Sequence, residues 1–260
     1  MMNSTNLAPL FEGWKEALIW SCLQGCMGYA VADNDREPTA AMITVGDFCF
    51  LAGVPNRGLA AKAAAPILVP RSEDWSRVIE SVWGNRVDRA LRYAIKKEPH
   101  VFDTDKLTTY VNAVPDPYAL KLFDGKIYEQ SRQEQWSCDF CSQFADYQDY
   151  SKRGLGVAAV CEGKLVSGAS SYAVYHGGIE IEIDTKPEFR QKGLATACGA
   201  KLILECLKRG LYPSWDAHDL RSVSLAEKLG YHMDFPYIRF TYEKTEIWWQ
   251  NRNREEHSPE

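Results

Sequence analysis

Three carboxylates occupy alternate positions in the segment 179–185: Glu180, Glu182 and Asp184. Isoleucines fill the positions before and between them, and this period of two is typical of a strand with one apolar face. A carboxylate can accept a proton from an ammonium group or attract that group by charge. We therefore expect a strand with Glu180 and Glu182 as candidate general bases. For any one of these acids, a solvated strand face is the more ordinary interpretation.

A short basic loop, residues 190–195, separates this strand from a helix whose apolar positions recur from Leu194 onward. Few side chains in this loop could take part in breaking a covalent bond. The unpaired N–H groups at a helix start favour an anion, and Gly193 allows close approach to the main chain. The spacing matches neither the nucleotide P-loop nor the dinucleotide fingerprint. The loop therefore predicts a phosphate-binding site built mainly from backbone amides.

The pattern Arg190-x-x-Gly193-x-Ala195 resembles the Arg/Gln-x-x-Gly-x-Gly/Ala motif of the GNAT superfamily of acyl-CoA-dependent N-acetyltransferases. Further along, the segment 219–231 resembles the N-x-x-S-x-x-L-x-E-K-x-G-F/Y ending of many GNAT domains, with Asp219 in place of asparagine. Segments 168–185 and 211–219 are similar to the zwittermicin A resistance type of GNAT acetyltransferase, and this likeness extends weakly over nearly the whole chain.

The resemblance implies that acetyl-CoA is the cosubstrate. In GNAT proteins the main chain of the strand before the loop binds the thioester oxygen and the pantetheine, and the loop binds the pyrophosphate. The implied cofactor-binding residues are Ile183, Asp184 and Thr185 on the strand and Arg190, Gln191, Lys192, Gly193, Leu194, Ala195 and Thr196 in the loop and helix start.

The resemblance leaves the general acid open, because Ala226 stands where many GNAT enzymes carry a tyrosine that meets the coenzyme sulfur. His218 is the nearest titratable candidate in the sequence, with Tyr231, Tyr212 and water as alternatives. A single histidine in a turn is more often incidental. Three further residues are candidates for the substrate pocket: Ser170, Ser171 and Trp215. We expect no metal site.

Periodicity and turn residues predict an α/β (α+β) chain with two domains, at 1–115 and 116–245, and a polar, disordered tail at 250–260. The second domain matches the GNAT fold, a mixed, mostly antiparallel, splayed sheet flanked by helices. We expect its strands at 118–123, 155–161, 165–174, 179–185, 212–217 and 237–244, and its helices at 125–131, 138–145, from 193 and from 222.

The first domain is smaller, and its pattern resembles the second one in part. It has predicted helices at 14–23 and 73–83, the latter capped by Ser72, and predicted strands at 28–32, 41–51 and 66–69. Only Pro70, Arg71 and Ser72 separate its last strand from the next helix, with no glycine for an anion site. This domain is either a degenerate GNAT-like half or an unrelated α/β cap, and coenzyme binding is assigned to the second domain alone.

Composition restricts the partners. The 260 residues include 30 basic and 35 acidic side chains, a formal charge of −5, so nucleic-acid binding has no electrostatic support. The amino-terminal segment lacks the features of a signal peptide, and no apolar run is long enough to span a membrane. The eight cysteines lie mostly in apolar stretches, as reduced core cysteines do. We expect a cytoplasmic monomer or homodimer.

Taken together, the sequence predicts an acetyl-CoA-dependent N-acetyltransferase that acts on a primary amine of a small molecule by direct attack in a ternary complex. The resemblance suggests an aminopolyol or amino-sugar-like antibiotic as the amine. Two alternatives stay open: a non-catalytic acyl-CoA-binding or sensory module, favoured by Ala226, and acyl transfer to a hydroxyl group or a protein lysine.

Overall fold

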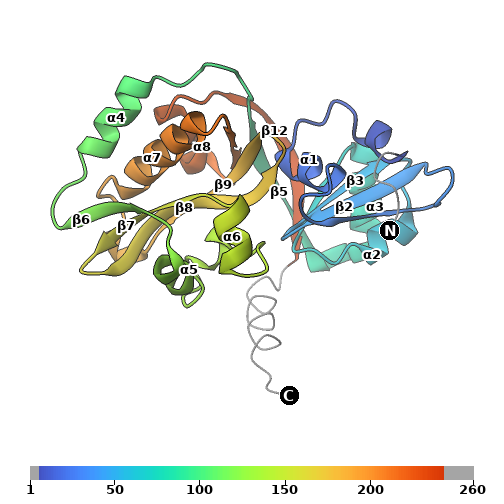
Figure 1. Ribbon diagram of the computed structural model, residues 1–260. Coiled ribbons are helices and arrows are strands. Elements are labelled where there is room, and N and C mark those ends of the chain that lie inside the picture. Colours follow the sequence, from blue (N-terminus) through green and yellow to red (C-terminus); the bar gives the residue numbers. More distant parts are fainter. Residues whose placement is uncertain (1–5, 243–260) are drawn as a thin grey trace. The chain divides into compact units, whose positions relative to one another are not determined.

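The computed structural model describes residues 6–242 and contains two compact units (Figure 1). The first unit holds the described residues up to Trp14, Cys22–Arg92 and the described residues from Tyr237 to Tyr242. The second holds Lys15–Ser21 and Tyr93–Pro236. This division differs from the expected boundary at residue 115, because the segment 93–115 packs with the second unit. The predicted tail at 250–260 lies outside the described residues.

The first unit is built on a mixed sheet. Its strands pair in the order β1-β2-β3-β4-β12, with β1, β2 and β3 antiparallel, β4 parallel to β3 and β12 antiparallel to β4. Strands β5 and β11 follow β12 in this order. Only the residues of β5 up to Arg92 and those of β12 from Tyr237 belong to the first unit. The bounds are η2 Ala8–Phe11, β1 Tyr29–Ala32, β2 Ala40–Val45, β3 Phe48–Gly53, α2 Arg57–Lys62, β4 Ile67–Pro70, α3 Glu73–Trp83, η3 Gly84–Arg86, β5 Val87–Ile95 and β12 Met233–Tyr242.

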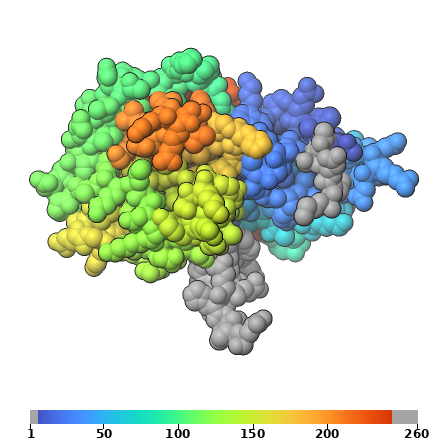
Figure 2. All heavy atoms as spheres, in the orientation of Figure 1, coloured from blue at the N-terminus to red at the C-terminus, as the bar shows by residue number. Residues whose placement is uncertain are grey.

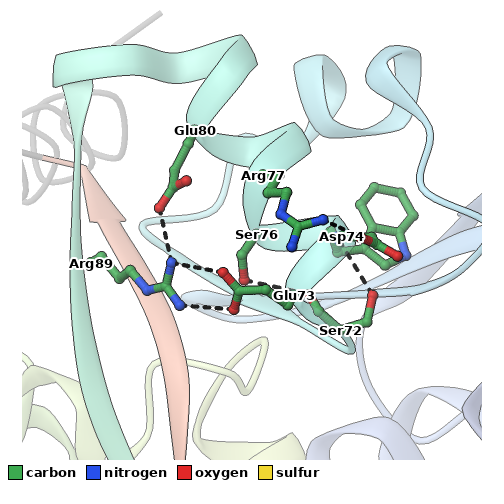
Figure 3. Close-up of polar contacts among 8 residues, drawn as sticks. Ser72, Glu73, Asp74, Ser76, Arg77, Glu80 and Arg89 are labelled. Atoms are coloured by element: carbon green, nitrogen blue, oxygen red, sulfur yellow. Dashed lines mark hydrogen bonds and ion pairs between the residues drawn. The ribbon is translucent and has the colours of Figure 1, made fainter.

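Helix α3 covers one face of this sheet, as its amphipathic pattern requires. Its fully buried Trp75 and Ile79 pack in a core with Leu51 and Phe240. The Ser72 side chain accepts a hydrogen bond from the Trp75 amide and caps the helix, as predicted. On the exposed side, the Arg89 guanidinium lies between the carboxylates of Glu73 and Glu80, at 2.8 and 3.2 Å, and connects β5 to α3 (Figure 3).

The second unit contains the other sheet, in the order β10-β9-β8-β7-β6. Strands β6 to β9 are antiparallel neighbours, and β10 is parallel to β9. In the space-filling view the orange segment of α7 and α8 reaches the surface, and α4 packs against α7 (Figure 2). The bounds are α1 Ala17–Leu23, α4 Thr104–Asn112, β6 Tyr118–Leu122, α5 Gly125–Ser131, η4 Cys138–Phe140, α6 Tyr147–Arg153, β7 Gly156–Cys161, β8 Lys164–Tyr175, β9 Gly178–Thr185, η5 Pro187–Phe189, α7 Leu194–Lys208, β10 Tyr212–Ser214, β11 Asp216–Ala217 and α8 Leu220–Lys228.

The structure confirms the mixed α/β fold and corrects some of the expected elements. The expected helix at 138–145 is wrong: Cys138–Phe140 is one 3₁₀ turn, and the helix comes later, at Tyr147–Arg153. The strand expected at 41–51 is a hairpin that turns at Gly46. Helix α8 begins at Leu220, earlier than expected, because the Asp219 side chain caps it.

The two units repeat one order of elements. In the first unit, β1, β2 and β3 are followed by helix α2, by β4 parallel to β3, and by helix α3. In the second, β7, β8 and β9 are followed by helix α7, by β10 parallel to β9, and by helix α8. Strand β3 therefore corresponds to β9, and helix α2 corresponds to α7.

Candidate functional site

The three acids of β9 lie on the sheet face that points away from α7. Ile183 belongs to the opposite face, since a Cβ added to Gly199 of α7 would lie 3.3 Å from its side chain. The alternation of a strand then places Glu180, Glu182 and Asp184 together on the other face. Glu180 is buried, with 6% of its surface exposed, whereas the other two are half-buried. The structure thus brings both candidate bases to one face, where their role stays a prediction.

Strands β9 and β10 separate shortly after they start to pair. Their register ends at Glu180 opposite Ser214. After Trp215 the chain continues as β11, which pairs with β5 at Ala94 and Tyr93 instead. This change of partner draws the chain away from β9. Beyond Glu180, the pairs described for β9 are with β8 alone. The result is an open strand edge.

The main chain of Ile183 and Thr185 belongs to that open edge. The Lys186 amide donates to the Val166 carbonyl of β8, so Lys186 makes its main-chain bonds toward β8. In an antiparallel pair these directions alternate, and residues 183 and 185 therefore point away from β8. The main chain of Asp184, by the same rule, points toward β8.

The backbone amide and the backbone carbonyl of Thr185 are both hydrogen-bonded to side chains. Its amide donates to the Asp184 carboxylate at 2.6 Å, and its carbonyl accepts from Arg190 Nε at 3.0 Å. Arg190 also approaches the Asp184 carboxylate at 3.4 Å. Burial raises the pKa of the Asp184 carboxyl, while the Thr185 amide and Arg190 act in the opposite direction. Arg190 therefore connects the loop to the strand end.

The loop exposes the start of α7. Gly193 caps the helix with a φ of 78°, and no side chain accepts a hydrogen bond from the first turn. A Cβ at Gly193 would meet nothing within 4 Å, so space is open beside it. Gln191 also has a left-handed φ of 62°. The N–H groups in the first turn of a helix have no acceptor within the helix. In α7 these are the amides of Leu194, Ala195 and Thr196, and we call this group of amides the cradle.

Lys192 adds a positive charge beside the cradle. Its Nζ donates to the Tyr118 hydroxyl at 3.0 Å and lies 5.0 Å from the centre of the Phe189 ring. Thr185, at the strand end, shares a hydrogen bond of 2.7 Å between its hydroxyl and that of Ser167. The loop residues expected from the sequence thus lie in one stretch at the end of β9.

Two tyrosines, Tyr175 and Tyr231, lie near the buried Glu180. The Glu180 charge contributes to the raised pKa values of Tyr175 and Tyr231, for which burial is the main cause. The Tyr231 hydroxyl donates to the Pro213 carbonyl at 2.7 Å, and the Tyr212 hydroxyl accepts from the Glu98 amide. His218, the candidate acid, is exposed on the turn before α8, and the buried Ala226 lies within α8.

The three substrate-pocket candidates are buried and hydrogen-bonded within the protein. Ser170 shares a hydrogen bond of 2.7 Å with the Tyr150 hydroxyl, and the Ser171 hydroxyl accepts from the Leu155 amide. The Trp215 indole N–H donates to Ser222 at 3.1 Å. Contact with a substrate therefore stays a prediction for all three, and these bonds give each one a structural role.

Sequence analysis missed two side chains beside Glu180. Tyr175 of β8 and Ser214 of β10 share a hydrogen bond of 2.9 Å that passes over Gly178 of β9. Strand pairing brings them together across 39 residues of sequence, and no local spacing signals such a pair.

The second unit also holds a cavity of about 500 Å³ at the opposite end of β9 from Gly178. Trp136, Lys164, Lys186 and Phe189 are among its lining residues. Within residues 6–242, no three metal-ligating side chains come together, and no helix is long and apolar enough to cross a membrane.

Several known proteins are similar to this chain in sequence or in fold. The family model described as GNAT acetyltransferase matches residues 8–240. An uncharacterized N-acetyltransferase of Bacillus subtilis (strain 168), YdfB, is 29% identical over 173 residues, which are 63% of this chain and 61% of that protein. The match therefore spans less than two thirds of this curated relative.

Two solved structures are similar to different degrees. A GCN5-related N-acetyltransferase-like protein from Streptococcus suis 89/1591 is 44% identical, with a TM-score of 0.89 over 93% of this chain and 98% of that chain. A GCN5-related N-acetyltransferase from Kribbella flavida is 14% identical, with a TM-score of 0.52 over 79% of this chain and 87% of that chain, and shares the fold alone.

Proposed function

The chain belongs to the GNAT acetyltransferase family, and from that premise we propose that it transfers an acetyl group from acetyl-CoA to a primary amine of a small molecule. One observation carries the proposal: the uncapped first turn of α7 follows directly on the open edge of β9. An anion held by the cradle leaves an extended arm free to run along that edge toward Glu180.

The cradle suits the pyrophosphate of coenzyme A. Backbone amides at a helix start donate to phosphate oxygens, and the left-handed Gly193 keeps a side chain out of the way. Lys192 supplies a nearby charge. In this proposal Arg190 is a positioning residue, because its guanidinium bonds the Thr185 carbonyl and the Asp184 carboxylate.

Along β9, the main-chain groups of Ile183 and Thr185 are the proposed partners of the pantetheine and the thioester oxygen. The Thr185 amide becomes available only when the Asp184 carboxylate releases it. A hydrogen bond to the thioester oxygen stabilises the charge that develops there during attack.

Glu180 and Glu182 are the proposed general bases. The amine must lose a proton before or during attack on the thioester, and a carboxylate acts directly or through a water molecule. Their shared face also attracts a cationic amine by charge. Among the general-acid candidates, His218 is exposed to solvent, whereas the Tyr231 hydroxyl is buried and bonded to a carbonyl. The departing thiolate then takes its proton from His218 or water.

The acceptor class and the assembly are further parts of the proposal. The likeness to zwittermicin A resistance proteins favours an aminopolyol or an amino-sugar-like amine. The eight cysteines are thiols rather than disulfides, which fits a reducing cytoplasm. The first unit is proposed to be a degenerate GNAT-like half, since its elements repeat the order of the second. A monomer or a homodimer is expected.

The test incubates the protein with acetyl-CoA and a panel of amines, aminoglycosides and aminopolyols, and measures free coenzyme A by chromatography. Release that depends on the amine supports the transferase. Binding of acetyl-CoA without release across a broad panel selects a non-catalytic acyl-CoA-binding module, and an acetylated hydroxyl or protein lysine in mass spectra selects a different acceptor. Failure to bind acetyl-CoA by a folded protein would overturn the proposal.

A further inference from the structure

The hydrogen bond between Tyr175 and Ser214 closes the gap between β9 and β10 at one end. Tyr175 lies opposite Gly178 on β9, and Ser214 lies opposite Glu180. Their hydroxyl groups, 2.9 Å apart, therefore join β8 to β10 across the strand between them. We call this pair the clasp.

Gly178 makes the clasp possible. A Cβ at this position would overlap the Tyr175 ring and its hydroxyl, so only glycine lets the ring lie flat across β9. Trp20 of α1 packs edge-on against the same ring, with the centroids 5.4 Å apart. Ser21 of α1 also donates to the Val174 carbonyl at 2.7 Å, beside Tyr175 on β8. The clasp is therefore held from several sides.

The clasp stays hydrogen-bonded at neutral pH. Burial raises the pKa of Tyr175 to about 12, and the nearby Glu180 charge acts in the same direction. The Tyr175 hydroxyl thus keeps its proton and can donate. Ser214 is fully buried. Breaking the pair would leave a buried hydroxyl without its partner, which is unfavourable.

The clasp lies where the acyl group of the acyl-CoA would be bound. Under the proposed function, the pyrophosphate lies at Gly193, and the coenzyme arm runs along the open edge from Thr185 toward Ile181. The acyl group, at the far end of that arm, comes nearest to Glu180 and the clasp. A longer acyl chain would contact the Glu180 carboxylate and the hydroxyl groups of Tyr175 and Ser214. These two hydroxyl groups are already hydrogen-bonded to each other.

We propose that Tyr175 and Ser214 are specificity-determining positioning residues, which close the acyl end of the β9–β10 gap and restrict the donor to short acyl groups such as acetyl. The inference rests on the proposed function, because it requires the coenzyme arm to lie along β9. The closed end is lined by polar groups. Methylene groups placed there would bury these polar groups without forming hydrogen bonds to them, which is unfavourable.

The test compares the affinities of acetyl-CoA and butyryl-CoA by calorimetry, in the full chain and without an acceptor. We expect the wild type to bind acetyl-CoA about tenfold more tightly, because the longer chain would cover the polar groups of the clasp without replacing their hydrogen bonds, and the lower end of that cost corresponds to about a factor of ten. The double variant Tyr175→Phe/Ser214→Ala removes both hydroxyls and leaves neither orphaned. It should reduce this preference to about twofold or less.

A matched control is Tyr242→Phe in the first unit. It deletes a tyrosine hydroxyl that donates to the Ala63 carbonyl at 2.7 Å, so it should lower stability without changing the affinity ratio. If the double variant does not fold, Ser214→Ala alone provides the comparison. An unchanged ratio in a folded clasp variant would overturn the inference. Absence of binding by both donors to the folded wild type would instead contradict the proposed function.

Discussion

The two units contain the same strand–helix junction in two different states. At the start of α7, Gly193 is the cap and no side chain occupies the first turn. At the start of α2, the Asn56 side chain accepts a hydrogen bond from the Leu59 amide. The flanking sequences are alike, since Arg57-Gly58-Leu59-Ala60 parallels Lys192-Gly193-Leu194-Ala195. In the first unit the glycine lies inside the helix, and the Asn56 side chain caps the first turn.

The strands before these junctions differ as well. Glu180 and Glu182 lie on the face of β9 that points away from α7. The corresponding face of β3, opposite the core that α2 covers, carries Phe48 and Phe50. Pairing between β3 and β4 continues to Leu51, and the Arg71 amide then donates to the Leu51 carbonyl. The same order of elements thus contains a strand with an open edge and an acidic face in one unit, and a strand with a closed edge and an apolar face in the other. Under the proposed function, the helix cap, the side chains of the strand and the pairing partner of the next strand decide which unit binds a ligand.

The largest expected effect tests the acids that only the second unit carries. Glu180→Gln should lower kcat by about 100-fold if Glu180 is the general base, the lower end of the usual range for such groups. The pH–rate profile should lose its acidic limb. Glu182→Gln tests the other acid in the same way, and the exposed Glu227→Gln on α8 serves as a control. If neither β9 variant alters the profile, the base is another group or water.

The next effect concerns the cradle. Gly193→Asp should weaken acetyl-CoA binding by at least about tenfold, or ~1.4 kcal/mol, because it blocks the main chain and adds negative charge near the pyrophosphate. Gly193→Asn separates the charge from the bulk, since both residues tolerate a left-handed φ. Gly58→Ala, at the parallel glycine of the first unit, should leave the affinity unchanged. Equal affinities for wild type and folded Gly193→Asp would contradict the cradle assignment.

A smaller effect concerns the closed junction. Asn56→Ala removes the helix cap and should lower the free energy of unfolding by about 1 kcal/mol, as measured by urea denaturation. Acetyl-CoA affinity should not change, because the first unit lacks an open edge beside this helix. Weaker coenzyme binding in this variant would assign the first unit a direct role.

The smallest effect arises at the end of β9, where Asp184 has no acidic counterpart at the end of β3. Burial raises its folded-state pKa, so the native state holds its proton more tightly than the unfolded chain. Its ionisation therefore lowers stability as pH rises above the usual aspartate range. Asp184→Asn should become more stable relative to wild type between pH 4 and pH 7, by urea denaturation at each pH. A constant difference would show that Arg190 offsets the burial.

Local sequence could predict the junction at β9 because a strand period, a left-handed glycine and a helical period all lie within 30 residues. It could not predict the opening beside that strand, which depends on β11 pairing with Tyr93 and Ala94. The apolar pattern around Phe140 predicted a helix, but these side chains fill the core from a 3₁₀ turn instead. In the first unit, Ser72 and its helix were predicted, while the six residues of α2 were too few to show a period.

The pairing of β11 with β5 also determines where the chain can be divided. A fragment that starts at residue 116 would contain every sequence motif of the family and still lack Tyr93 and Ala94, the residues that hold β11 away from β9. In such a fragment the two strands are free to close on one another. Truncations intended to isolate the second unit should therefore retain the segment from residue 93, because residues outside the motif determine the width of the gap.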